Sequence, residues 1–237
     1  MVNIDTTIPL AIVAVIAALI LLAIRSSRRN RERRQQVFGA LGFSSVDPPS
    51  SLVEKISRLY HDTALVRRGK SGRIRLSHVF GRRVGDGEMF VFDLIDVSGD
   101  EDSHSERQVV AVVSARLQMP TFLLFPKSDQ TGGASRAANR LLTWLASKVA
   151  ASLEFPGVPQ FGERYLVISA DTDRTRKFLD AALLKHFADT PLLLIHAGHD
   201  LFTLSRIGNT RQKIEEIADL VGQAESLFRL FQSGSQG

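Results

Sequence analysis

Residues 74–97 read IRLSHVFGRRVGDGEMFVFDLIDV, and this stretch decides the fold class. Two runs rich in β-branched and aromatic residues, 74–84 and 89–97, flank the tetrapeptide GDGE at positions 85–88. Glycine and aspartate readily adopt the backbone angles of a tight turn, so the stretch predicts a β-hairpin.

More β-prone segments follow the hairpin. Residues 108–115 (QVVAVVSA) and residues 121–125 (TFLLF) extend it to a predicted antiparallel meander of three or four strands. Farther along the chain, residues 164–169 predict a further strand. Residues 192–195 and 201–205 predict a second hairpin across the turn HAGHD.

Amphipathic segments with a period near 3.6 residues predict the helices. The expected helices are residues 25–42, 134–152, 173–187 and 211–232, with a short one that starts at Ser50 or Ser51 as N-cap. Groups of neighbouring strands separated by helices favour the α+β class over a doubly wound parallel sheet. We therefore expect a soluble α+β domain in which the meander and the hairpin pack against helices.

Near the N-terminus, residues 8–24 (IPLAIVAVIAALILLAI) contain no charged or hydrogen-bonding side chain. As a helix they would be about 25 Å long, at the short end of what crosses a bilayer core. A buried core helix of this length usually carries a polar stripe, and this one has none. The stretch predicts a transmembrane helix, with Ile8, Pro9, Leu10, Ile16, Leu21 and Ile24 among its members.

The charges around this segment predict its orientation. Only Asp5 precedes it, whereas six arginines opposed by Glu32 follow: Arg25, Arg28, Arg29, Arg31, Arg33 and Arg34. An excess of Lys and Arg marks the cytoplasmic side, and a cleaved signal peptide would carry its charge before the apolar run. We expect a single-pass protein of the inner membrane, N-terminus out, whose arginines contact lipid headgroups.

This topology divides the chain into four parts. Residues 1–7 form a short extracytoplasmic N-terminus, 8–24 the transmembrane helix, 25–49 a basic juxtamembrane helix and linker, and 50–237 a cytoplasmic α+β domain.

Composition narrows the possible functions. The net charge of +5 belongs mostly to the arginine segment, because residues 35–237 retain 24 basic and 23 acidic residues, a net charge of +1. Nucleic acid is therefore not an expected partner. The chain has no cysteine, which excludes thiol catalysis, disulfides and cysteine-ligated metals.

The sequence DTDRT (171–175) directly follows the strand predicted at 164–169. It resembles the first motif of the haloacid-dehalogenase phosphatases, and this resemblance implies a nucleophilic Asp171 and an acid/base Asp173 acting with Mg²⁺. The same residues predict an N-cap for the helix at 173–187. No acidic pair for the metal follows in the sequence, so we favour the cap and keep a phosphohydrolase as an alternative.

His196, His199 and Asp200 offer two imidazoles and a carboxylate, which are ligands of transition metals. They lie between two apolar strands, with Ala-Gly at the centre, which is more typical of a hairpin turn. We predict no catalytic residue, no metal site and no cofactor.

The order of several segments resembles a group of bacterial single-span membrane proteins of unknown function with a cytoplasmic α+β domain. The segments are ALGFSSVDPP (40–49), MFVFDLIDVSG (89–99), QVVAVVSARLQMPTFLLFPK (108–127), FGERYLVISADTDRTRKFL (161–179) and LLLIHAGHDLFTLSR (192–206). The resemblance implies that the aspartates at 171 and 173 open a helix, and it implies no activity.

The sequence thus predicts a membrane-tethered cytoplasmic binding or scaffold module, with other membrane or membrane-associated proteins as partners. The contact surface is expected on the long C-terminal helix or on an exposed edge of the meander. One alternative is a Mg-dependent phosphohydrolase using Asp171 and Asp173. Another is a sensor of anionic lipid surfaces through the arginines from Arg25 to Arg34.

Overall fold

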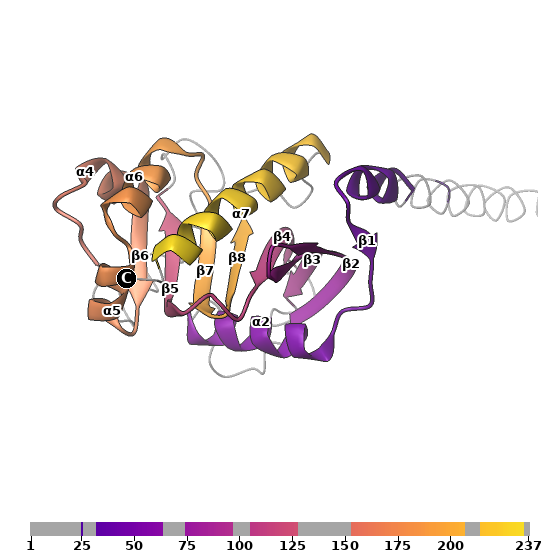
Figure 1. Ribbon diagram of the computed structural model, residues 1–237, viewed down its shortest axis with the longest axis horizontal. Coiled ribbons are helices and arrows are strands. Elements are labelled where there is room, and N and C mark those ends of the chain that lie inside the picture. The colour runs from indigo at the N-terminus through magenta and orange to yellow at the C-terminus, as the bar shows by residue number, and fades with distance from the viewer. Residues whose placement is uncertain are drawn as a thin grey trace, which may run out of the picture. The chain divides into compact units, whose positions relative to one another are not determined.

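Figure 1 shows a computed structural model that describes residues 25, 32–63, 74–96, 105–127, 153–206 and 214–234. The fold is α+β, as predicted, with an antiparallel sheet of eight strands and helices around it. The chain divides into two compact units, Met1–Ser44 and Ser45–Gly237.

The transmembrane prediction lies outside the described residues. Residues 8–24 belong to this undescribed part, together with Arg28, Arg29 and Arg31. None of the helices that the structure describes is both long and apolar enough to span a bilayer.

In the first unit, residues 32–40 are helical, and Arg25 and Arg33 are exposed. Gly42 has φ of 78°, a backbone angle that glycine adopts without steric cost, so the predicted helix stop is confirmed. The backbone N–H of Phe43 donates to the carbonyl of Phe38 at 2.8 Å, which closes the end of the helix.

The second unit contains most of the sheet. Its strands are β2 (Ile74–Val84), β3 (Gly87–Asp96), β4 (Ser105–Val113), β5 (Met119–Pro126), β6 (Tyr165–Ser169), β7 (Leu194–His199) and β8 (Leu201–Ser205). Together with the two-residue β1 (Ser44–Ser45), they have the order β1-β2-β3-β4-β8-β7-β5-β6. The meander therefore comprises β2, β3 and β4, and the hairpin of β7 and β8 separates β4 from β5.

Both predicted hairpins form, with one correction to their turns. Val84 pairs with Gly87, as the GDGE sequence indicated. In the second hairpin Gly198 pairs with Leu201, so the turn is only His199-Asp200. His196 is consequently a strand residue, because the shorter turn extends β7 beyond the predicted position 195.

The described helices of this unit are α2 (Ser50–Asp62), α4 (Pro159–Arg164), α5 (Thr172–Phe178), α6 (Ala181–Asp189) and α7 (Ile214–Gly234). The N-cap of α2 is Pro49, not Ser50 or Ser51, and the Pro49 carbonyl accepts a hydrogen bond from Val53 N at 3.2 Å. The helix expected at 134–152 lies outside the described residues.

The helix expected at 173–187 is two helices, α5 and α6. The break lies at Asp180, whose side chain caps α6 by accepting from Leu183 N at 2.9 Å. The α4 helix is not among the helices expected from the sequence. Pro159 occupies its first turn, where a missing N–H removes no helical hydrogen bond.

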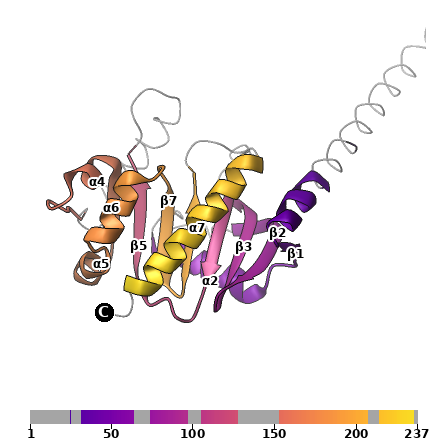
Figure 2. The ribbon, with the colours of Figure 1, turned by 45° about the horizontal axis from the view of Figure 1, so that its top comes forward.

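Helices α2 and α7 cover opposite faces of the sheet, as comparison of Figures 1 and 2 shows. The α2 helix buries Leu52, Ile56 and Leu59 in one core cluster with Phe90 and Phe92 of β3. On the other face, Phe231 of α7 meets Phe202 of β8 edge to face, with ring centroids 5.0 Å apart. Because both faces are covered, the central strands are apolar on both sides.

Candidate functional site

Five polar side chains lie on the α2-covered side of the sheet: Tyr60, Arg107, His196, Thr203 and Ser205. We call them the α2 polar cluster. His196 of β7 is directly opposite Thr203 of β8, and Ser205 is two residues farther along β8. Alternate strand residues share a face, so all three point to the same side as Leu201, which packs with α2.

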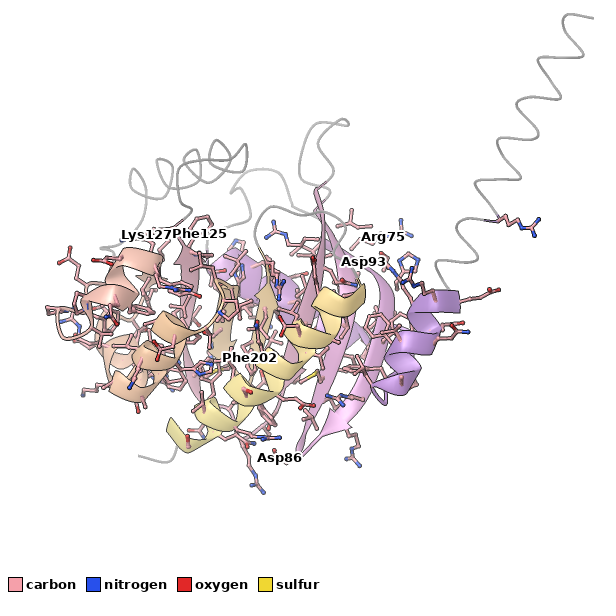
Figure 3. All side chains as sticks on the ribbon, turned by 90° about the horizontal axis from the view of Figure 1, so that it is seen from above. Arg75, Asp86, Asp93, Phe125, Lys127 and Phe202 are labelled. Carbon is pink, nitrogen blue, oxygen red and sulfur yellow. The ribbon has the colours of Figure 1, made fainter. Side chains whose placement is uncertain are left out.

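The β4 strand contributes Arg107 to the same side. Ala111 is opposite Thr203 and belongs to the core cluster under α2, and Arg107 is four residues before it on the same face. Arg107 is paired with Leu94 near the end of β3. Figure 3 shows this end of the strands at the labels Arg75 and Asp93, opposite Asp86 at the other end.

The last turn of α2 lies against His196. The rings of Tyr60 and His196 are stacked, with centroids 4.1 Å apart and an interplanar angle of 18°. The Thr63 hydroxyl donates to the Leu59 carbonyl at 2.7 Å and lies 2.8 Å from Nδ1 of His196. Because its hydrogen is used for the carbonyl, the hydroxyl accepts from Nδ1–H, which leaves a lone pair on Nε2.

The hydroxyls of Tyr60 and Thr203 are neighbours, and a hydrogen bond between them acts on the phenol. The hydroxyl oxygen of Ser205 and Nε2 of His196 have no hydrogen-bond partner within the described part of the chain. Tyr60, His196, Thr203 and Ser205 are each at most 3% exposed.

Charge in the cluster is confined to Arg107. Burial, reinforced by the Arg107 charge, lowers the pKa of His196 well below its ordinary value of 6.5. Burial raises the pKa of Tyr60 above 10.0, although Arg107 and the neighbouring Thr203 hydroxyl act in the opposite direction. Tyr60 and His196 are therefore both neutral near pH 7, and the half-buried Arg107 faces them with a positive charge.

Asp171 is the N-cap of a helix, as its position in the sequence predicted. Its Oδ1 accepts from the backbone N–H of Arg174 at 3.1 Å, which makes it the N-cap of α5. Asp171 and Asp173 are both exposed. Across the described residues, no group of three His, Asp or Glu side chains is placed to hold a metal ion.

The structure also separates His196 from the two residues that follow it in the HAGHD sequence. His196 is buried under α2, whereas His199 is exposed in the turn with φ of 55°. The Asp200 carboxylate forms an ion pair with Lys55 of α2. The three side chains therefore do not converge as metal ligands.

A second buried polar contact lies on β2 and β3. Asp93 is 3% exposed, and its Oδ2 lies 3.0 Å from Nδ1 of His78. His78 has φ of 50° in a β-bulge between Ser77 and Phe80, which turns its ring toward Asp93.

Sequence reasoning missed the α2 polar cluster. The available signal was the presence of Thr203 and Ser205 in a strand of otherwise apolar residues, together with His196 next to Ile195. Polar residues in a strand that is buried on both faces need either a partner or a function.

No family model matches this chain, and comparison with curated proteins gives no match. Among solved structures, it is similar to the mycobacterial trehalose monomycolate transport factor A, with 12% identity and a TM-score of 0.47. The match covers 86% of this chain and 92% of that one. At this level the likeness bears on neither the fold nor the function.

Proposed function

We propose that this protein is a membrane-tethered binding or scaffold module whose α+β domain works at the cytoplasmic face of the inner membrane. One observation carries the proposal: the uncharged residues 8–24 are followed by six arginines within ten residues. Such a segment is long enough to cross a bilayer, and the arginines favour the cytoplasmic side.

Tethering gives a binding domain a specific advantage. Two proteins confined to one membrane meet at a raised effective concentration, so a weak contact between them is sufficient. The net charge of +1 over residues 35–237 suits a protein partner better than nucleic acid. Along α7, the exposed side includes Asp219, Ser226 and Arg229 and supplies a polar surface for such a partner.

The geometry around Asp171 favours this proposal over the phosphohydrolase alternative. A nucleophilic carboxylate needs a free oxygen aimed at phosphorus and a metal beside it. Asp171 caps α5 through Oδ1, Asp173 lies in the exposed first turn of the same helix, and no third His, Asp or Glu of the described residues joins them to hold a metal ion. We therefore expect no Asp171-dependent hydrolysis of a generic phosphate ester with Mg²⁺. Any activity that is measured should survive the Asp171→Asn substitution.

Membrane extraction and topology mapping test the tether. The full-length chain should stay in the membrane fraction after washing with carbonate or high salt, and a chain lacking residues 1–24 should be released. In spheroplasts, a C-terminal tag should resist external protease. Release of the full-length chain by carbonate, or cleavage of the tag from outside, would contradict the proposal.

A liposome experiment separates the tether from lipid sensing by the arginines. The two forms to compare are residues 25–237 and residues 35–237, each with neutral vesicles and with anionic vesicles. If the protein is mainly a lipid sensor, only the longer form binds, and only to anionic vesicles. If residues 8–24 are what attaches the protein to the membrane, both truncated forms stay largely unbound to the vesicles at physiological salt.

The scaffold role is tested by cross-linking in intact membranes. The full-length chain, carrying a photoreactive side chain at Ser226 or Arg229, should give a discrete cross-linked product with another membrane protein. The matched control carries the photoreactive group at Lys177, in α5. Identical product patterns at all three positions would argue against a specific contact on α7.

A further inference from the structure

We propose that Asp86, in the turn between β2 and β3, is a site of spontaneous covalent modification. The modification is conversion of aspartate to isoaspartate, and in the folded protein Arg116 and Gln232 hold it back. The inference goes beyond the proposed function and does not depend on how the protein is attached to a membrane.

The reaction needs only the chain and water. The backbone nitrogen of Gly87 attacks Cγ of the protonated Asp86 carboxyl, and the carboxyl OH leaves with the N–H proton as water. A five-membered cyclic imide results. Water then adds to one of its two carbonyls: hydrolysis at Cγ restores aspartate, and hydrolysis at the original peptide carbonyl gives isoaspartate. The mass of the protein is unchanged, but its backbone now runs through the side-chain methylene.

The sequence favours this reaction at one place. Asp86 is the only aspartate in the chain that is followed by glycine. Any other residue would place a Cβ beside the attacking nitrogen, whereas glycine leaves it open to approach. The fold requires glycine at 87, because a Cβ there would lie 2.6 Å from the Val113 carbonyl oxygen. The hairpin therefore keeps the most reactive neighbour that this aspartate can have.

Two side chains from outside the turn hold the Asp86 carboxylate. Its Oδ2 lies 2.6 Å from Nε of Arg116, and its Oδ1 accepts from Nε2 of Gln232 at 2.7 Å. Arg116 follows β4, and Gln232 belongs to the last part of α7. Because both oxygens are engaged by other elements, the carboxylate must leave these partners before Cγ can approach the nitrogen of Gly87.

The backbone of the turn is restrained as well. Val84 pairs with Gly87, and Phe228 of α7 packs on the turn. A Cβ built on Gly85 would lie 3.7 Å from the Phe228 ring, and one on Gly87 would lie 3.2 Å from it. Figure 3 shows Asp86 at the lower rim of the sheet in that view. Modification should therefore proceed mainly in molecules where the end of α7 has moved away from the hairpin.

The product cannot keep these contacts. Isoaspartate adds one methylene to the backbone between Gly85 and Gly87 and attaches the carboxylate directly to Cα. The added atom disturbs the pairing of Val84 with Gly87, which depends on a turn of fixed length. We expect modified molecules to unfold at a lower temperature than unmodified ones.

The test ages the full-length chain in detergent at constant pH, below its unfolding midpoint. The free peptide 84–107, which trypsin releases from the chain, is the unfolded reference. Mass spectrometry with electron-transfer fragmentation distinguishes isoaspartate from aspartate and assigns it to position 86. We expect the folded chain to react at least about tenfold more slowly than the peptide. Asp86→Glu should abolish the reaction, because its cyclisation would require a six-membered ring.

Variants test the two contacts. Gln232→Leu and Arg116→Met each remove a donor and keep the approximate size of the side chain, and each should move the rate severalfold toward that of the peptide. Gln223→Leu and Arg229→Met are the matched controls. They change the same residue types elsewhere on α7 and should leave the rate unchanged.

Two results would overturn the proposal. If the folded chain reacts as fast as the peptide, or if the control variants accelerate the reaction as much as Gln232→Leu and Arg116→Met, the contacts to Asp86 do not hold the reaction back. If neither Gln232→Leu nor Arg116→Met forms isoaspartate at position 86 by the time the peptide is largely converted, Asp86 is not a modification site of the folded protein.

Discussion

His196 makes the stability of this domain depend on pH. Its pKa in the folded protein lies well below 6.5, because burial and the nearby Arg107 charge both disfavour the protonated ring. The unfolded chain therefore takes up a proton near pH 6.5 that the folded chain does not. The stability is fully present above that pH and is lost as the pH falls toward the folded pKa.

We predict that protonation of His196 in the unfolded chain lowers the free energy of unfolding below pH 6.5 by up to about 1.4 kcal/mol per pH unit. His196→Gln should flatten the decline. Urea denaturation between pH 5 and pH 8 measures both. His186 is the control: burial also lowers its pKa, but Asp189 opposes the shift and the ring is partly exposed, so His186→Gln should change the slope less.

Asp171 gives a second prediction at the residue scale. Asp171→Ala removes an N-cap and should cost on the order of 1 kcal/mol of stability, and Asp171→Ser should recover most of that loss. Asp173→Ala is the matched control. It removes only a charge near the helix dipole and should cost under about 0.5 kcal/mol. Equal losses in the two alanine variants, measured by urea denaturation, would exclude the cap as the reason for the aspartate.

These two residues also show what a sequence can reveal at this scale. The cap at Asp171 is local, since its partner is the backbone three residues later. The contact between Thr63 and His196 joins residues 133 positions apart. It depends on where α2 crosses the sheet, and no local pattern of residues fixes that crossing.

At the element scale, the approach of α2 to β7 depends on one glycine. An added Cβ at Gly198 would be 2.9 Å from the Thr121 hydroxyl, closer than such contacts occur. We predict that Gly198→Ala destabilises the domain by about 1–3 kcal/mol, because α2 or β5 must shift. It should also raise the exposure of Tyr60, which fluorescence quenching would detect.

The control for this substitution lies on α7. Gly222 is an exposed helix residue, and a Cβ there would meet nothing within 4 Å. Gly222→Ala should stabilise the protein by about 0.5–1 kcal/mol, since alanine loses less backbone entropy in a helix. Thermal unfolding of the two variants should therefore shift in opposite directions. An unchanged or raised midpoint for Gly198→Ala would mean that glycine at 198 has no packing role.

Most elements were predictable from local patterns, but their pairing was not. The apolar runs of β2, β3 and β4 and the turn at Gly85 gave the meander, with the turn glycine at φ of 57°. The neighbours of β5 could not be inferred, because several apolar strands compete for the same position until the whole sheet is assembled. The break at Asp180 was missed, since leucines at helical spacing continue on both sides of it.

At the scale of the whole molecule, residues 45–237 form one compact unit that holds the sheet from β2 to β8. Helices α2 and α7 cover its two faces, and the cores they bury share the same strands. We predict that this fragment unfolds in a single cooperative transition. Midpoints in urea from tyrosine fluorescence and from circular dichroism should coincide. Two separated transitions would show that the two faces of the sheet are independent.

The position of β7 and β8 has a consequence for synthesis. These strands are the last to be made, yet they lie in the middle of the sheet, between β4 and β5. From Pro126 to Ser205 the ribosome adds 79 residues, which takes roughly 4–16 s at about 5–20 residues per second. During that interval the nascent chain carries two half-sheets, one ending at β4 and one at β5, with unpaired inner edges. Such edges can pair with strands of other chains. If the N-terminal segment enters the membrane first, as proposed, these half-sheets wait at the membrane surface, where chaperone protection is needed most.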